Sequence, residues 1–451
     1  MTATTDLLAF AGAPHTLPPQ VRSDAIRLLS DTLAVGAAGA SAPGADAILN
    51  TARSFGAGSD ARLLDTNMRL PAASAAFVNG FRIHALEWDA VHEPAVVHAM
   101  SVVTAALGAA IDRRGGCDPD EALTALCVGV DIACGLGIAA DSPLTFFRPA
   151  TAGLIGAAIA VARIEGASMA DTLGLAYSQC AGTMQAHVEG SVALPFQIAN
   201  AARAAIVAAD LAKAGFTGPH DALEGPFGYF KLFDIGDLSR YTNDLGQIWQ
   251  ISEISTKPFP SGRASHGILG ALSDERKSKA ASTSSAKSAW KGHPPNTAFA
   301  ELVEALPSSL EAIKAHVPPL VARLVGRPMT PDMTPAHARL CLPFLTALML
   351  TDGVIDPRRF TSETFADPAI RDLANRVTVT VDDNPDPNAL SPQQIEIDGE
   401  TILVPHTLGS PDAPMDIHQT KRKRDLCDAL AGDIPDRRLF DDPLAYFTEP
   451  Q

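Results

Sequence analysis

Apolar residues recur at helical spacing through about the first 255 residues of the chain. The first such segment follows Pro18 and Pro19, and its apolar side chains recur every three or four residues, as on one face of a helix. The same pattern is found in six further segments. Together they predict helices over Val21–Gly39, Ala72–Ala85, His98–Asp112, Pro119–Ala139, Thr151–Glu165, Met169–Gln185 and Ile198–Gly215.

Alanine and glycine, rather than leucine, fill these segments, and no alternating strand pattern appears among them. Because small side chains let helix axes approach closely, this half of the chain is expected to be a tight, all-helical bundle.

The pattern changes near residue 250. Alternating residues predict strands at Gln247–Ile254, His316–Val325, Arg376–Asp382 and Ile395–Val404, the last with a hairpin turn at Asp398-Gly399. Helical spacing returns at Pro335–Thr351 and Thr420–Leu430. The fold class is therefore mainly α, with a large all-helical domain (residues 1–255) and a smaller α+β domain (residues 256–404). The C-terminal region, residues 405–451, is expected to return to the bundle.

Residues 274–297 carry Lys, Ser, Ala and Thr without a hydrophobic period. This composition is typical of a flexible insertion. We expect a surface segment that lies outside the chemistry.

Composition and charge narrow the functional classes. Apolar residues make up 46% of the chain and charged residues 19%, a balance that supports a large core. The net charge of −16 argues against a nucleic-acid partner, because phosphate binding requires a basic face. The one basic run, residues 421–424, stands beside Asp425 and Asp428 and is expected to be a solvated helix face.

The six cysteines form no C-x-x-C pair, which fits free thiols in a reducing compartment. The N-terminal stretch MTATTDLLAF has no basic region before its apolar residues, so no secretory signal is expected. The apolar runs fall short of the roughly 20 residues that span a membrane. The sequence predicts a soluble, cytoplasmic protein with no membrane partner.

The densest titratable cluster runs from His84 to His98. His84 and Glu87 are three residues apart, Asp89 and His92 follow, and Pro94 predicts a loop. Histidines and carboxylates in a loop are suited to acid–base catalysis and anion binding. Two other interpretations stay open: a helix end with solvated charges, and a metal site. The cluster lacks the H-x-x-x-H spacing that places two imidazoles on one helix face, so no metal is expected.

A second cluster, KPFPSGRASHG, spans residues 257–267. Ser261 is a candidate N-cap of a helix whose first turns carry Arg263 and His266, a suitable place for a substrate carboxylate. Lys257 precedes it on a proline-stiffened segment and becomes a base if desolvation lowers its pKa. The alternative is a capped surface helix.

Arg148 precedes a predicted helix and is a weaker candidate for anion binding, a surface arginine being the alternative. The sequence contains no G-x-G-x-x-G, Walker A or G-x-S-x-G motif, which disfavours dinucleotide, P-loop and α/β-hydrolase chemistry.

Four segments together resemble motifs of the MmgE/PrpD family, and they occur in the family's order over nearly the whole chain. They are Asn79-Gly80 with HALEWD at 84–89, AGFTGP…LEG at 214–225, KPFP…RASHG at 257–267, and AR…LPF at 338–344. The resemblance implies an all-helical first domain, a smaller α+β domain, an active site in the cleft between them, and a homodimer. The family includes 2-methylcitrate dehydratase, cis-aconitate decarboxylase and iminodisuccinate epimerase, so a small di- or tricarboxylate is the expected substrate and no cofactor is expected.

Carried over to this chain, the resemblance places Glu87, Asp89, His98, Lys257 and His266 at or near the active site. The chain departs from the family pattern at five positions. Ala90 replaces a second aspartate, Ala99 a proline after the histidine, Leu194 a lysine, Arg148 a histidine of the decarboxylase and dehydratase branches, and Phe344 a tyrosine.

The family reactions share the loss of a group at carbon next to a carboxylate. Since several dehydratase- and decarboxylase-type groups are replaced here, the first expectation is epimerisation of an iminodisuccinate-type substrate. Lys257 and His98 would be the opposed acid–base pair, with Glu87 and Asp89 beside them. Arg263, His266, Arg148, His84 and His92 would bind substrate. The alternatives are a 2-methylcitrate dehydratase-like hydro-lyase and a non-catalytic binding relative.

Overall fold

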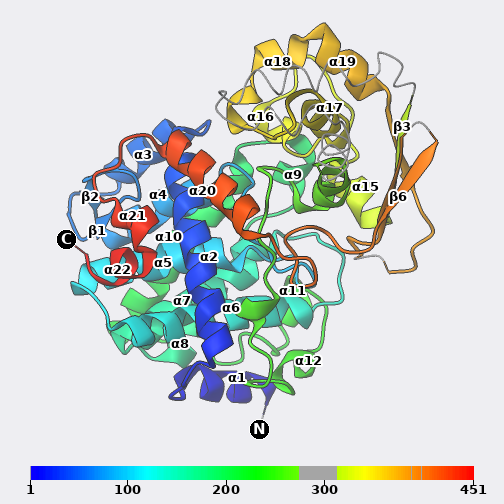
Figure 1. Ribbon diagram of the computed structural model, residues 1–451. Coiled ribbons are helices and arrows are strands. Elements are labelled where there is room, and N and C mark those ends of the chain that lie inside the picture. The colour runs from blue at the N-terminus through cyan, green and yellow to red at the C-terminus, as the bar shows by residue number, and fades with distance from the viewer. Residues whose placement is uncertain (1, 274–311, 387–388, 398, 451) are drawn as a thin grey trace. The chain divides into compact units, whose positions relative to one another are not determined.

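Helices form most of the larger of two compact units, which comprises residues 1–188, 192–256 and 416–451. The computed structural model describes residues 2–273, 312–386, 389–397 and 399–450, and Figure 1 shows their elements. The helices of this unit, here unit 1, are α1 Ala3–Gly12, α2 Pro19–Ala38, α3 Ala45–Ser54, α4 Ala72–His84, α5 Ala99–Arg114, α6 Pro119–Ile138, α7 Arg148–Glu165, α8 Met169–Tyr177, α10 Ala193–Lys213, α11 Tyr229–Leu232, α12 Ser239–Thr242, α20 Ile417–Ala431, α21 Arg438–Asp441 and α22 Pro443–Thr448.

Short elements complete unit 1. Two 3-10 turns, Gly39–Ser41 and Gln250–Glu253, lie in the same unit, and a two-residue ribbon pairs β1 (Ala61–Arg62) with β2 (Arg69–Leu70) in antiparallel register. The short helix α9, Gln185–Glu189, ends at the first residue of the other unit. The unit is thus mainly helical without being strictly all-helical.

Glycine allows the central helices α6 and α7 to pack closely. A Cβ at Gly156 of α7 would lie 2.2 Å from the carbonyl oxygen of Gly129, and one at Gly129 of α6 would lie 2.8 Å from the carbonyl oxygen of Gly156. Only hydrogen fits there. The small residues of the sequence therefore produce the close bundle packing that was predicted from them.

The Asn79-Gly80 motif of α4 has a packing role. Asn79 Nδ2 donates to the carbonyl of Arg62, and Asn79 Oδ1 accepts from the amide of Leu64, which fixes the chain beside β1. A Cβ at Gly80 would meet the backbone of α10 at 3.3 Å. This motif holds α4 in place and thereby positions His84 at its C-terminal end.

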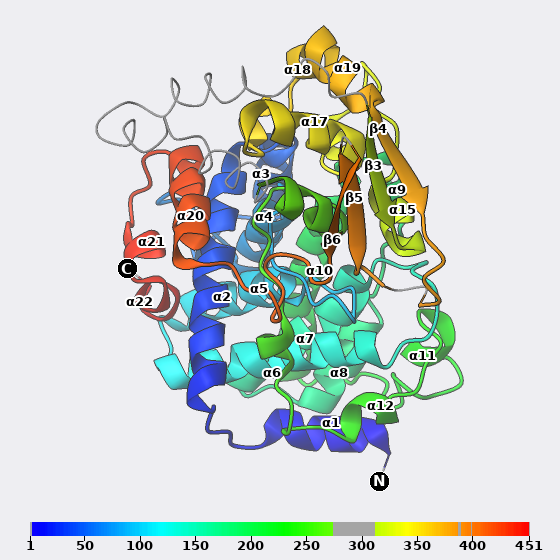
Figure 2. The same cartoon turned by 45° about the vertical axis from the view of Figure 1, so that its right-hand side comes forward.

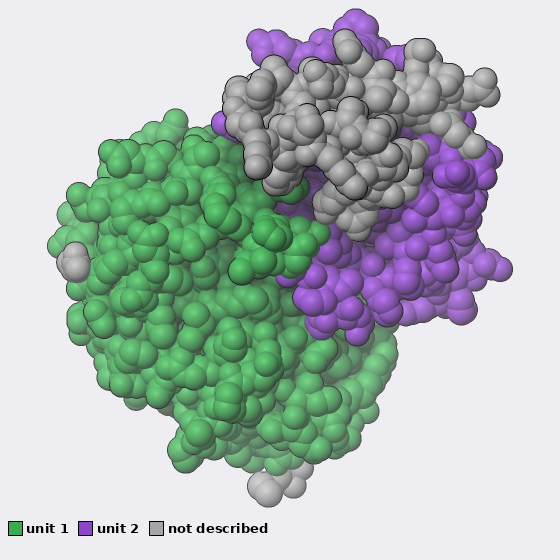
Figure 3. All heavy atoms as spheres, viewed as in Figure 1, with its two compact units in different colours: residues 1–188, 192–256, 416–451 green, residues 189–191, 257–415 purple. Residues whose placement is uncertain are grey.

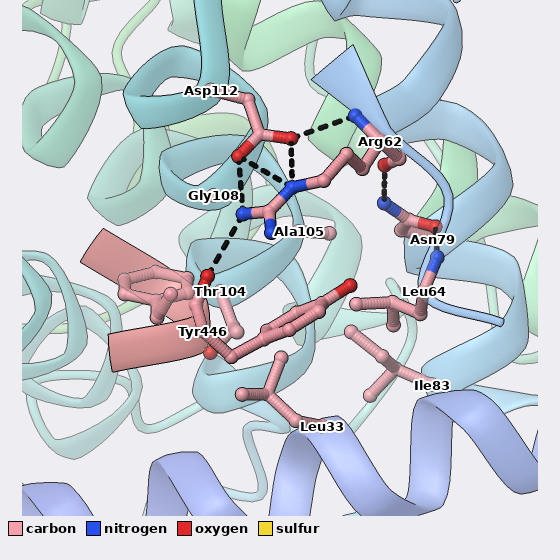
Figure 4. Close-up of a pocket in the computed structure, with 11 residues that line it drawn as sticks. Leu33, Arg62, Leu64, Asn79, Ile83, Thr104, Ala105, Gly108, Asp112 and Tyr446 are labelled. Atoms are coloured by element: carbon pink, nitrogen blue, oxygen red, sulfur yellow. Dashed lines mark hydrogen bonds and ion pairs between the residues drawn. The ribbon is translucent and has the colours of Figure 1, made fainter. Parts of the chain in front are cut away.

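The C-terminal helix α22 closes a small cavity in unit 1 (Figure 4). Arg62 forms a bidentate ion pair with Asp112, from Nε to Oδ2 and from Nη2 to Oδ1, and donates to the carbonyl of Tyr446, whose ring lies under its guanidinium. The cavity has a volume of about 20 Å³, and the Thr104 hydroxyl on its wall has no hydrogen-bond partner among the described residues. That volume suits one buried water molecule.

Unit 2 comprises residues 189–191 and 257–415 and contains a four-stranded mixed sheet. The strand order is β4-β3-β5-β6, with β3 parallel to β4 and antiparallel to β5, and β5 antiparallel to β6. Figure 3 colours the two units separately. The described elements of unit 2 include the 3-10 turns Arg263–Ser265 and Pro357–Arg359, helical residues 266–273, β3 Ile313–Val317, α15 Pro319–Val325, α16 Pro335–Ala338, α17 Leu342–Asp352, α18 Ser362–Ala366, α19 Pro368–Asn375, β4 Val377–Val381, β5 Gln393–Ile397 and β6 Glu400–Val404.

Several sequence predictions are corrected. Gln247–Ile254 was expected to be a strand, but Gln250–Glu253 forms a 3-10 turn. The strand predicted at His316–Val325 ends at Val317, because Pro318 and Pro319 remove ladder donors and begin α15. The helix predicted over Pro335–Thr351 is two helices, since Pro343 lies in the first turn of a separate helix, α17.

Other predictions are confirmed or lie outside the described residues. The strand at Arg376–Asp382 and the β5–β6 hairpin are present, although Asp398 of the hairpin turn is not described. The segment 274–297 also lies outside the described residues. Helix α6 is long and apolar enough to cross a membrane, but 89% of that stretch is buried inside the unit, as in the core helix of a globular domain.

Candidate active site

The cluster predicted around His84 begins where α4 ends. His84 is the last residue of the helix, and the amide of Glu87 donates to the His84 carbonyl at 3.0 Å, so a tight turn follows. Glu87 occupies the left-handed region with φ of 53°. The turn brings Glu87 Oε1 to 3.3 Å from His84 Nε2. The predicted pairing of these two residues is thus present, but a turn rather than a continuing helix produces it.

Asp89 lies between two imidazoles in the interior of unit 1. His84 Nδ1 is 2.9 Å from Asp89 Oδ2, and His98 Nδ1 is 3.0 Å from the same oxygen. Ser101 on α5 donates its hydroxyl to this carboxylate as well. The two imidazole rings meet edge to face with centroids 4.8 Å apart. One carboxylate therefore orients both histidines.

The electrostatics of Asp89 favour its ionised form. Its exposed fraction is 0%, and burial alone would raise the pKa of the carboxyl. The charges and hydrogen bonds of His84 and His98 outweigh burial and hold the pKa of Asp89 well below its usual value. Of the two imidazoles, His98 is the more accessible, with 12% of its side chain exposed against 1% for His84.

The same three side chains form the group that is best suited to hold a metal ion among the described residues. One ligand atom each from His84, Asp89 and His98 lies within 4.8 Å of the others. His84 and His98 are fourteen positions apart, so spacing along a single helix could not reveal this group. The Asp89 carboxylate is already within bonding distance of both imidazoles and the Ser101 hydroxyl, and an ion would have to displace their protons. The expected absence of a metal remains a prediction.

His92 is buried with both ring nitrogens bonded inside unit 1. The amide of Ala95 donates to Nδ1 at 3.2 Å, so the proton resides on Nε2, which lies 3.1 Å from Gln250 Oε1. Burial lowers the pKa of His92 to about 4. Both ring nitrogens of the neutral His92 are therefore bonded within the protein. That His92 binds substrate stays a prediction.

Arg148, the first residue of α7, is also buried. Its guanidinium donates to Asp234 through Nε at 3.2 Å and through Nη2 at 3.2 Å. Nη1 donates to the carbonyl of Ala95 at 3.2 Å, and Nη2 donates to that of Ser142 at 3.0 Å. Asp234 in turn accepts from the hydroxyls of Ser142 and Tyr229. Arg148 thus fastens the loop between His92 and His98; whether it also binds substrate is untested.

The second predicted cluster lies in unit 2, at the start of its longer segment, residues 257–415. Lys257 and His266 are 0% exposed and Arg263 is 6% exposed. Arg263 donates to the carbonyls of Leu408 and Thr407 at 2.6 and 3.1 Å, and its Nη1 lies 3.4 Å from His266 Nδ1. His266 Nε2 faces Ser261 Oγ at 3.1 Å. The structure therefore brings Ser261, Arg263 and His266 together, but Ser261 is not the predicted N-cap, because Gly262 precedes the 3-10 turn Arg263–Ser265 and no side chain caps it.

Sequence reasoning missed several residues that support the site. Ser101 lies one helical turn after His98, so helix periodicity could have pointed to it. Asp234 and Gln250 are distant in sequence from their partners Arg148 and His92, and no local pattern signals them. Lys423 was placed on a solvated face, yet its side chain is 4% exposed and its Nζ donates to the carbonyl of Trp88 at 3.0 Å.

Comparison with known proteins identifies the family from two separate matches. Residues 11–240 match the MmgE/PrpD N-terminal domain, and residues 293–438 match the MmgE/PrpD C-terminal domain.

Three similar proteins are named as cis-aconitate decarboxylases or as decarboxylase-like. The cis-aconitate decarboxylase-like protein oryM of Aspergillus oryzae is 29% identical over 57% of this chain, and the match spans 58% of that relative. Cis-aconitate decarboxylase of Mus musculus is 26% identical over 82% of the chain and 74% of its own length, and that of Homo sapiens is 26% identical over 69% and 62%. With its N-terminal match alone covering half of its length, the chain belongs to the MmgE/PrpD family.

Proposed function

We propose that this protein is a lyase that acts on a small polycarboxylate and breaks a bond at carbon next to a carboxylate. The observation that carries the proposal is the buried Asp89 carboxylate between His84 and His98. A buried carboxylate beside an imidazole fixes the ring and stabilises its protonated form, as in other acid–base sites. His98, the more accessible ring, is the residue that exchanges the proton.

The same pair serves either of two bond cleavages. In a decarboxylation the carbon–carbon bond breaks, carbon dioxide leaves, and protonated His98 delivers its proton to the carbon that keeps the electron pair. In a dehydration neutral His98 removes the proton next to the carboxylate, the carbon–oxygen bond breaks, and hydroxide leaves with a proton from a second acid. Positioned proton transfer of this kind is worth about 10²–10⁴-fold in rate.

Cationic side chains of unit 2 supply the candidates for holding the substrate carboxylates. Arg263 and His266 are buried together near Ser261. An arginine binds a carboxylate through two parallel hydrogen bonds, and such contacts stabilise charge that develops next to it. Their substrate contacts, and the catalytic roles of Glu87 and Lys257, are part of the proposal.

The comparisons favour cleavage over the epimerisation expected first from the sequence. The relatives named above are decarboxylases or decarboxylase-like, and none is named as an epimerase. Epimerisation stays the second candidate because this chain lacks a histidine of the decarboxylase and dehydratase branches. Arg148 stands at that position, and its guanidinium is bound to Asp234 and two carbonyls.

One experiment separates the candidates. The purified protein is incubated in D₂O with cis-aconitate, 2-methylcitrate and iminodisuccinate, each followed by NMR, with released carbon dioxide measured in parallel. A lyase produces carbon dioxide or a new alkene resonance, and the His98→Asn variant loses that product. Exchange at the α-carbon with racemisation and no cleavage would support the epimerase instead. No turnover of any of these carboxylates would contradict the lyase proposal and favour the binding relative.

A further inference from the structure

Helix α20, Ile417–Ala431, has a charged residue on its buried face. A capping box formed by Asp416 and Gln419 begins the helix, and its two buried residues are Lys423 and Cys427. These residues are four positions apart and therefore share one face. Lys421, Arg422 and Arg424 are exposed, so the basic run was correctly expected to be solvated except at Lys423.

Lys423 connects three parts of unit 1. Its Nζ lies 2.7 Å from Asp31 Oδ1 on α2 and donates to the carbonyl of Trp88 at 3.0 Å. Only 3% of the Lys423 side chain and 13% of the Asp31 side chain are exposed. Figures 1 and 2 both show α20 next to α2. A residue of the C-terminal region thus reaches the backbone of the segment that carries Glu87 and Asp89.

Packing alone does not explain a lysine at this position. Removing an ammonium ion and its carboxylate partner from water is unfavourable, and an apolar pair of similar volume is often as stable. What lysine supplies, and an apolar residue cannot, is a hydrogen-bond donor to the Trp88 carbonyl. Asp31 neutralises the ammonium and fixes the direction in which it points.

The Trp88 carbonyl belongs to a turn that needs support. Glu87, the residue before Trp88, has φ of 53°, a conformation that is unfavourable for a non-glycine residue and persists only where the surroundings impose it. The following residue, Asp89, must stay within 3.0 Å of both imidazoles. Trp88 is 1% exposed, with its ring 5.5 Å from Lys423 Nζ.

We propose that Lys423 is a positioning residue for the active site. Held by Asp31, it fixes the Trp88 carbonyl and thereby the turn that places Asp89 between His84 and His98. The effect on turnover rests on the function proposed above, whereas the effect on the turn itself does not.

The test removes the ion pair without leaving a lone buried charge. The double variant Lys423→Met/Asp31→Asn keeps side-chain volume on both helices, and Lys421→Met is the matched control, a lysine of the same helix that is 70% exposed. At a temperature well below unfolding of all three proteins, the double variant should lower kcat at least about tenfold with KM changed less than about twofold. Hydrogen exchange in the peptide covering residues 84–92 should be faster in the double variant and unchanged in the control.

The two readouts separate the inference from the proposed function. If the double variant unfolds at a lower temperature but keeps both wild-type kcat and wild-type exchange in residues 84–92, Lys423 is only a packing residue and the inference is wrong. If the wild type turns over no polycarboxylate, the proposed function fails. Faster local exchange in the double variant would then still support the positioning of the turn, and unchanged exchange would overturn it.

Discussion

His92 and Gln250 face each other in the interior of unit 1, with His92 Nε2 3.1 Å from Gln250 Oε1. The backbone N–H of the same Gln250 donates to Asp131 Oδ2 at 2.8 Å. Gln250 therefore joins a histidine that burial keeps neutral to a carboxyl whose pKa burial raises to about 6. The two groups have opposite consequences for stability as the pH changes.

The pKa of His92 falls from 6.5 to about 4 on folding, so between these values the unfolded chain binds more protons and stability rises with pH. The pKa of Asp131 rises from 3.8 to about 6, so over that window the folded chain binds more protons and stability falls with pH. Each shift corresponds to about 3 kcal/mol, and the two effects largely cancel in the wild type.

Substitution should reveal each effect separately in denaturant unfolding between pH 4 and 6.5. Relative to the wild type, Asp131→Asn should gain about 3 kcal/mol of unfolding free energy from pH 4 to pH 6, because the opposing contribution is lost. His92→Gln should lose about as much from pH 4 to pH 6.5. Parallel stability curves for the three proteins would contradict the assigned ionisation states.

Removing the charge of Asp89 should impair catalysis more than folding. Asp89→Asn keeps the shape of the side chain but no longer stabilises protonated His98, so kcat should fall about 10²–10⁴-fold. Asp131→Asn is the matched control, since Asp131 is another 0% exposed carboxyl of unit 1 that is bonded to Tyr241 and Gln250. Equal kcat in the Asp89 variant and the control would refute the role of Asp89.

Breaking the Arg148–Asp234 pair should both destabilise unit 1 and disturb the loop before His98. Arg148→Met leaves Asp234 buried without its cation, which should cost about 3–5 kcal/mol of unfolding free energy. The double variant Arg148→Met/Asp234→Asn should recover part of this stability but not kcat, because the Ala95 carbonyl still lacks its donor. A double variant with wild-type kcat would show that Arg148 serves stability alone.

Metal removal should leave turnover unchanged. The Asp89 carboxylate is engaged by His84, His98 and Ser101, so an ion bound to this carboxylate would have to displace these contacts. Turnover is measured before and after dialysis against a chelator. Activity that disappears and then returns with one added divalent ion would make His84, Asp89 and His98 metal ligands.

The sequence predicted the helices whose positions depend on local patterns, and it failed for elements and residues whose structure depends on contacts between distant parts of the chain. Helical periodicity located α2, α4, α5, α6, α7 and α10, with ends within a few residues except at α10, whose start at Ala193 was predicted five residues later. The predicted helix over Met169–Gln185 ends at Tyr177 instead, and Gly182 beyond it has φ of 102°. The alternation of QIWQISEI was misleading, because Ile251 lies in a 3-10 turn and Ile254 directly follows it, and both are buried without a strand.

In the candidate site, too, the sequence predicted local groupings of residues but not contacts between distant segments. The motif at residues 84–89 placed His84, Glu87 and Asp89 in one segment, and the loop after Asp89 is present. The convergence of His98 on Asp89 depends on how α5 packs against α4, which no spacing along the chain encodes. Lys423 is 335 positions from Trp88, and its exposed neighbours made it look like one more surface charge.

The sequence predicts that Lys257 is a catalytic base, and kinetics can distinguish this role from that of an anion ligand. Lys257 is 0% exposed and is the first residue of the longer segment of unit 2, which also carries Arg263 and His266. A residue that only binds an anion interacts with ground and transition states alike, so its loss should mainly raise KM. A base acts in the transition state, so Lys257→Ala should lower kcat about 10²–10⁴-fold with little change in KM.

The arginine variant separates charge from proton transfer. Lys257→Arg keeps the positive charge, but a guanidinium does not release its proton at working pH and therefore cannot replace a base. We expect kcat of Lys257→Arg to be as low as that of Lys257→Ala, with both proteins folded by circular dichroism. If Lys257→Arg kept most of the wild-type kcat, Lys257 would be an electrostatic clamp for a substrate carboxylate. Proton transfer would then rest on His98 alone, whose Nδ1 lies 3.0 Å from Asp89 Oδ2.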